Sequence, residues 1–164
     1  MRTTTLRLYS LEYKQAKTYL AVALFVAGNI LLPQLCHLVP QGGIRWLPIY
    51  FFTLVGAYKY GWKVGLLTAI VSPLVNSALF GMPAVLLKSV LLAVAAGYAA
   101  MYFRKASLLL LVAVVLFYQV VGTLGEWIMV GDFYKAVQDF RIGLPGMFLQ
   151  IVGGWLFINH IIRK

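Results

Sequence analysis

The chain has 164 residues, of which 62% are hydrophobic and only 11% are charged, and its mean hydropathy is +0.88. An ordinary soluble domain is far more polar, so the composition predicts an integral membrane protein with no separate soluble domain. The formal net charge of +10 does not predict binding to nucleic acid, because the basic residues are scattered between apolar segments instead of forming one polar face.

Six apolar segments follow one another along the chain, separated by charged residues and by turns that contain glycine or proline. A helix needs about 20 apolar residues to cross the hydrocarbon core of a bilayer. The segments therefore predict an all-α fold, a single domain over residues 1–164 that forms an integral membrane bundle of six transmembrane helices. The expected spans are residues 18–35, 47–58, 61–80, 84–103, 107–129 and 144–162.

The distribution of lysine and arginine predicts the orientation of the bundle. With six spans and a cytoplasmic N-terminus, ten of the 14 basic residues lie in inner segments, as the bias of cytoplasmic loops requires. We therefore expect a protein of the cytoplasmic membrane with both termini cytoplasmic. The inner residues are Arg2, Arg7, Lys14, Lys17, Lys59, Lys63, Arg104, Lys105, Arg163 and Lys164, and the outer ones are Arg45, Lys88, Lys135 and Arg141.

Two alanines of the first span, Ala23 and Ala27, are four residues apart and share one helical face. Small residues at this spacing allow another helix to approach closely within the membrane. The neighbouring helix belongs either to the same bundle or to a partner protein, and the sequence alone favours packing within the bundle.

An irregular segment rich in glycine and proline, residues 33–48, follows the first span and predicts an outer loop. Trp46 in this segment is either an aromatic anchor at the membrane interface or a residue that stacks on a ligand. The second span, 47–58, is short and aromatic. A short span can begin below the membrane surface, and its outer end, with Tyr50, would then open a pocket.

The third span carries small and polar residues at helical spacing, which places them on one face. Such a face is too polar for lipid tails, so we expect it to lie against another helix or a cavity. The residues of this face are Gly61, Gly65, Thr68, Ser72 and Asn76.

The fourth and fifth spans each carry a charged residue near the outer end. Lys88 lies about one turn inside the fourth span, and Glu126 is the only carboxylate within any expected span. Because charged residues in a membrane usually pair and mark functional sites, Glu126 is expected to pair with Lys88. The alternative is that Lys88 extends to the membrane surface. Gln119 and Thr123 share the helical face of Glu126.

The polar residues near the outer side predict a binding pocket. Ligand sites combine apolar walls with a few placed polar groups, and polar groups at one depth in lipid must bond to each other or to a ligand. We expect a small organic ligand with a carboxylate or a similar polar group. The predicted substrate-binding residues are Trp46, Tyr50, Asn76, Lys88, Gln119 and Glu126.

After the fifth span, residues 127–143 combine aromatic residues with charges of both signs, which predicts a structured outer loop or an interfacial helix. No nucleotide-binding loop, zinc motif or set of serine, histidine and aspartate with catalytic spacing occurs in the chain. We therefore expect neither enzyme activity nor a bound cofactor or metal ion.

Four short motifs resemble a known family when they are taken in their order along the chain. They are residues 60–65, 72–77, 81–83 and 143–150. With the six expected spans, they resemble the substrate-binding S components of energy-coupling factor vitamin transporters. In that family an S component captures a vitamin or a related compound near the outer surface. A transmembrane coupling subunit and two ATP-binding cassette ATPase subunits then drive uptake.

The resemblance implies roles for particular residues. Ala23 and Ala27 would contact the coupling subunit, and the loops around Trp46 and Met82 would close over the ligand. S components for nickel and cobalt have a histidine directly after the first methionine, whereas this chain has Arg2, which argues against a metal substrate. Related sequences often carry a glutamate in the fourth span, where this chain has only Lys88.

The alternative function is that of a structural or assembly membrane protein without small-molecule cargo. The outer polar residues distinguish the two hypotheses. A scaffold has little reason to carry several half-buried polar groups at one depth, because such groups are costly in a membrane.

Overall fold

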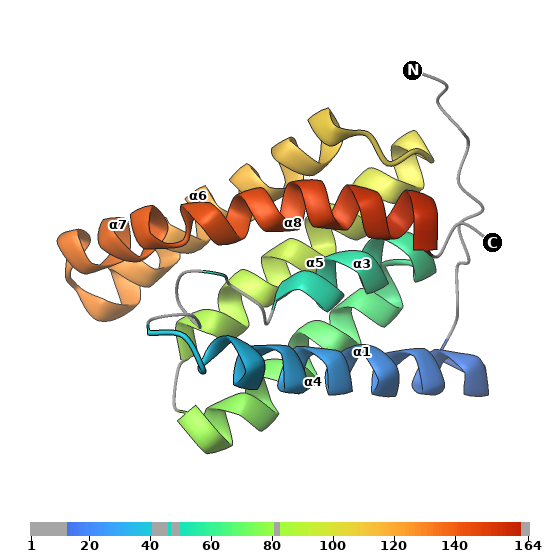
Figure 1. Cartoon of the computed structure of the whole chain (residues 1–164), viewed down its shortest axis with the longest axis horizontal. Helices are drawn as coiled ribbons and strands as arrows, with labels where there is room; N and C mark the ends of the chain where they lie inside the picture. The colour runs from blue at the N-terminus through green and yellow to red at the C-terminus, as the bar shows by residue number, and fades with distance from the viewer. Residues whose placement is uncertain (1–12, 41–45, 47–49, 81–82, 162–164) are drawn as a thin grey trace.

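The computed structural model describes residues 13–40, 46, 50–80 and 83–161, without the side chains of residues 76–80, 83–84 and 139 (Figure 1). This part of the chain is mostly helical and contains no strand, which confirms the predicted all-α class. Its elements are α1 (Ala16–Cys36), α3 (Phe51–Tyr60), α4 (Trp62–Phe80), α5 (Pro83–Phe103), α6 (Leu108–Val130), α7 (Phe133–Ile142), α8 (Leu144–Leu156) and the π-helical turn η2 (Phe157–Ile161).

Three helices of the described part are long and apolar enough to cross a membrane: α1, α5 from Val85, and α6. A fourth candidate is the pair formed by α7 and Leu144–His160, which bends by 45°. The six expected spans are therefore confirmed only in part. Helix α3 has only ten residues, and α4 has 19 residues, of which the side chains are described over Trp62–Val75, an apolar stretch.

The helices are arranged so that the start of α1 and the end of η2 lie at the same end of the bundle, on the right of Figure 1. Helix α7 lies at the opposite end, where α6 turns into α8. We call the end that contains α7 the α7 end of the bundle.

Local sequence explains how α6 and α7 begin and end. The Ser107 hydroxyl accepts from the Leu110 N–H at 3.2 Å and so caps the start of α6. Gly131 ends α6 in a left-handed conformation with φ 73°, which glycine adopts without strain. Asp132 then accepts from the Lys135 N–H at 3.2 Å at the start of α7. Of the two alternatives predicted for residues 127–143, a structured loop or a helix, the structure has a helix, α7, over Phe133–Ile142, and residues 127–130 belong to α6.

Helix α3 is the most enclosed element, since it contacts α1, α4, α5, α8 and η2. Leu54, Val55, Ala57 and Tyr58 have no exposed surface. Close approach to α4 is possible because Gly65 has no side chain, and a Cβ atom there would lie 2.6 Å from the Ala57 Cα. Helix α3, which lies within the second predicted span and just beyond it, therefore has a central packing role, and the pocket expected at the outer end of that span stays a prediction.

A polar cluster holds α1, α3 and α4 together inside the bundle. The Asn29 side-chain amide donates to the Thr53 hydroxyl at 3.0 Å and to the Ser72 hydroxyl at 3.1 Å, and all three residues are fully buried. The Asn29 carbonyl oxygen accepts from the Phe52 N–H at 3.2 Å. Asn29 therefore satisfies one of the free amides at the start of α3 from a different helix.

The small and polar face of the third predicted span is buried as expected. Gly65, Thr68 and Ser72 all lie inside the bundle. The Thr68 hydroxyl donates to the Val64 carbonyl of its own helix at 2.9 Å. This face therefore lies against α1 and α3. Of the two predicted neighbours, another helix or a cavity, these three positions have a helix.

Candidate functional site

Lys88 of α5 and Glu126 of α6 form an ion pair near the α7 end of the bundle. The Lys88 Nζ donates to the Glu126 Oε2 at 2.5 Å, and the two residues are 8% and 7% exposed. The predicted pairing is confirmed, so Lys88 does not reach out alone to the surface. Because the two charges cancel, the pair is electrically neutral as a unit.

Glycine residues of α6 make room for this pair. A Cβ atom on Gly122 would lie 2.5 Å from the Lys88 Cγ, so the lysine stem occupies the space that a larger residue would fill. Gly125 similarly leaves room for the Leu87 side chain. Gly122 was not among the predicted site residues. Its position three residues after Gln119 and four before Glu126, on their helical face, is the signal that could have found it.

A second polar group joins α6 to α8. The Tyr118 hydroxyl donates to the Gln150 Oε1 at 2.7 Å and accepts from the Gln119 Nε2 at 2.9 Å. The ring of Tyr50 lies against that of Tyr118, with 5.5 Å between centroids. All four residues are at most 3% exposed, and Tyr118 has no exposed surface at all.

The structure thus brings two predicted residues, Tyr50 and Gln119, into one cluster through Tyr118. Sequence reasoning did not assign Tyr118 or Gln150 to the site. Gln150 is a polar residue within an apolar span, and this is the signal that could have identified it as a site residue. Tyr50 is 3% exposed and packs in the hydrophobic core, and its role as an aromatic wall of a ligand pocket stays a prediction.

Helix α6 carries both polar groups on one face. Gln119 and Glu126 are seven residues apart, about 10 Å along the helix axis. Between them the Thr123 hydroxyl is buried with no hydrogen-bond partner in the described part of the chain, and so is the Ser89 hydroxyl beside Lys88. Buried hydroxyls without a partner are costly, and they are positions where a ligand or water gains a bond.

The remaining predicted residues are placed as follows. Trp46 is 37% exposed, while the side chain of Asn76 lies outside the described residues. Ala23 and Ala27 are exposed on α1, whose buried face is formed by Thr18, Val22, Val26, Asn29 and Pro33. The alanine pair therefore faces away from the bundle, and the alternative that it packs within the bundle is not supported.

The geometry favours noncovalent recognition. Lys88 has three N–H donors and uses one of them on Glu126, so the pair retains donors and carboxylate lone pairs for a ligand. Among the described residues no group of three or more histidine, cysteine, aspartate or glutamate side chains could hold a metal ion. In the described part of the chain, these polar residues can contact a ligand through hydrogen bonds and through the Lys88–Glu126 ion pair.

Comparisons with models of protein families, with curated proteins and with solved structures found no match for this chain.

Proposed function

We propose that the chain is the membrane-embedded, substrate-binding subunit of an energy-coupling factor type importer. It captures a vitamin or a related small organic micronutrient near the outer surface, and ATP hydrolysis in partner subunits drives uptake. The observation that carries the proposal is the buried polar face of α6, with the Lys88–Glu126 pair and the Gln119–Tyr118–Gln150 chain. The choice of this family is supported by the resemblance of the four sequence motifs to those of S components.

The decisive experiment is mass spectrometry of small molecules released on denaturing the purified protein. We expect one organic compound to be released in a constant ratio to protein from the wild type. The double variant Lys88→Met/Glu126→Gln should release none, because the pair would no longer offer charged donors and acceptors. A structural or assembly protein would release no compound that depends on these two residues, and that result would reject the proposed function.

We further propose six membrane crossings, made by α1, α3, α4, α5, α6 and the combined α8 and η2. In this arrangement the α7 end faces outward and the start of α1 faces the cytoplasm, in agreement with the distribution of basic residues. The short helix α3 is accommodated because its neighbours cover it on all sides. Two exposed lysines at opposite ends of the bundle, Lys14 and Lys135, allow a test.

Single cysteines at Lys14 and Lys135 should react differently with a membrane-impermeant thiol reagent in intact cells. With Cys36 replaced by serine, we expect labelling of Lys135→Cys and not of Lys14→Cys, because only the α7 end is accessible from outside. Permeabilised cells provide the control, since both cysteines should then react. Labelling of Lys14→Cys alone in intact cells would reverse the proposed orientation.

The exposed face of α1 is proposed as the contact with a transmembrane coupling subunit. Ala23 and Ala27 are flanked on this face by Leu20 and Leu24, which are 65% and 66% exposed. A surface of small and apolar residues permits close helix packing in lipid. Neither hydrophobic cluster of the described residues contains Ala23 or Ala27, so the core of the bundle does not depend on these two side chains.

Replacing both Ala23 and Ala27 by tryptophan should stop co-purification of the coupling subunit and stop uptake. Ligand release by the isolated protein should stay unchanged, since the substitutions lie on the outer face of α1. The control is Leu109→Trp, which adds the same kind of bulk at an exposed position of α6 and should leave co-purification intact. Normal uptake by the double tryptophan variant would place the partner interface elsewhere.

A further inference from the structure

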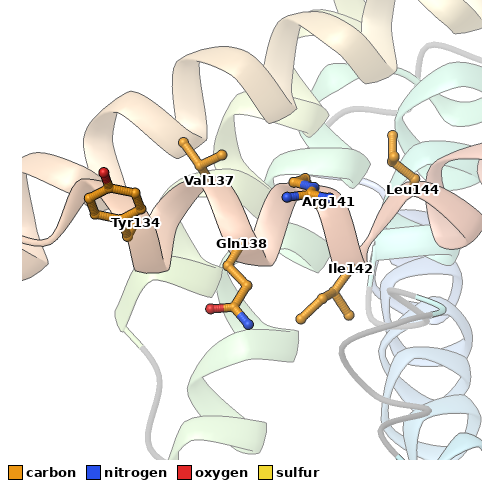
Figure 2. Close-up of a pocket in the computed structure, with 6 residues that line it drawn as sticks. All are labelled: Tyr134, Val137, Gln138, Arg141, Ile142 and Leu144. Carbon is orange, nitrogen blue, oxygen red and sulfur yellow. The ribbon is translucent and has the colours of Figure 1, made fainter.

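An open groove of about 580 Å³ runs along α7, and Figure 2 shows the side chains that line it. The lining residues recur at helical spacing, so they form one face of α7 and continue into α8. The opposite face attaches α7 to the bundle through Ala136, which is buried, and Phe140, which packs against the core. The groove is lined by Tyr134, Val137, Gln138, Arg141, Ile142 and Leu144.

The groove combines an apolar floor with a small number of polar groups. Val137, Ile142 and Leu144 supply apolar surface, and Gln138 and Arg141 supply hydrogen-bond donors. Its volume falls in the range of about 300–1,000 Å³ that is typical of small-molecule sites. The groove therefore offers enough volume for a small molecule and combines apolar surface with hydrogen-bond donors.

Charge indicates which ligands fit. Lys88 is neutralised by Glu126, so the buried polar face of α6 offers no net positive charge to an anion. Arg141 is exposed, and among the described side chains no carboxylate pairs with it. A guanidinium binds carboxylate or phosphate through two parallel hydrogen bonds, which a neutral group cannot match.

We infer that the groove along α7 binds a small molecule with one anionic group on an apolar body, and that Arg141 holds the anion. Val137, Ile142 and Leu144 pack against the apolar body, and Gln138 donates to a neighbouring oxygen. The inference rests on the proposed capture function and makes it more specific. It assigns recognition of the ligand's negative charge to Arg141. The Lys88–Glu126 pair then binds the uncharged hydrogen-bonding groups of the ligand.

The test uses 4-(trifluoromethyl)benzoate as probe and fluorine NMR of the protein in nanodiscs of zwitterionic lipid. The wild type should bind this anion, and should bind the neutral 4-(trifluoromethyl)benzamide far more weakly. Arg141→Gln should weaken binding of the anion by about ten- to a hundredfold, the value of a hydrogen bond to a charged group. Arg141→Lys should keep most of the affinity.

The matched control is Lys135→Gln, which removes the same charge from the same helix at a position that does not line the groove. Its affinity should equal that of the wild type. Equal weakening in Lys135→Gln and Arg141→Gln would mean attraction to the general surface charge and would overturn the inference. No binding of the probe to the wild type would overturn it as well.

A lipid headgroup carries the same anionic chemistry, so a further arm uses nanodiscs that contain phosphatidylglycerol. We expect the probe to keep its affinity there. Loss of probe binding in these nanodiscs would assign the groove to the lipid instead. The proposed function is judged separately, because a natural ligand that is released normally from Arg141→Gln and lost from Lys88→Met/Glu126→Gln would reject only the role of Arg141.

Discussion

Lys88→Met alone should destabilise the protein by about 3–5 kcal/mol, because it leaves the Glu126 carboxylate buried without its partner. The double variant Lys88→Met/Glu126→Gln should recover most of this loss, since neither of the two positions then carries a charge. Replacing a whole buried pair by neutral residues of similar volume is often tolerated, whereas removing one partner is not. The wild type, both single variants and the double variant therefore form a cycle that isolates the interaction.

The measurement is the free energy of unfolding in one detergent, from a reversible titration with sodium dodecyl sulfate. Lys135→Met serves as the control, because it removes an exposed lysine and should change stability by less than about 0.5 kcal/mol. If Lys88→Met is no less stable than the double variant, the two charges do not depend on each other, and the ion pair does not contribute to the free energy of unfolding.

Gly65→Leu should abolish the folded bundle, because the new side chain would collide with the backbone of α3. A Cβ atom at this position already lies 2.6 Å from the Ala57 Cα and 3.2 Å from its N atom. A backbone cannot move aside as a flexible side chain can, and overpacking in a close-packed interior costs about 1–3 kcal/mol even when the structure adapts. With the rest of the leucine side chain added, α3 and α4 must separate.

Gly153→Leu is a suitable comparison within the same protein. A Cβ atom there would meet only side-chain atoms, those of the Phe51 ring at 3.3 Å and of Leu149 at 3.7 Å. We expect Gly153→Leu to elute as a monodisperse species from size-exclusion chromatography, and Gly65→Leu to aggregate or be degraded. Equal behaviour of the two variants would show that the α3–α4 contact is looser than its geometry implies.

Several features of the fold follow from the sequence because they depend on one helix at a time. Helical period alone assigns Gly65, Thr68 and Ser72 to a buried face, and the structure confirms this. The Lys88–Glu126 pair was also predictable, because two opposite charges at similar depth in adjacent apolar segments have few other partners. Helix α7 was one of two alternatives predicted from the aromatic and nearly charge-balanced composition of residues 127–143.

Other features depend on which helices meet, and helical period does not contain that information. The hydrogen bonds of Asn29 join three helices, so no single segment indicates them. The contact between Tyr118 and Gln150 likewise joins α6 to α8 across 32 residues. Six crossings were inferred from apolar runs, whereas three or four helices of the described part are long and apolar enough, and the helix within the second expected span, α3, has only ten residues.

The start of α3 has a consequence for how the chain enters the membrane. Ten helical residues extend about 15 Å, half the thickness of the hydrocarbon core, so this segment is poorly suited to insertion on its own. Its Phe52 amide donates to the side chain of Asn29, which precedes α3 in the chain and is therefore synthesised earlier. We expect α1 to act as an intramolecular template for membrane integration of α3. In a translocon assay, integration of the α3 segment should therefore fall when α1 is replaced by a polyleucine helix.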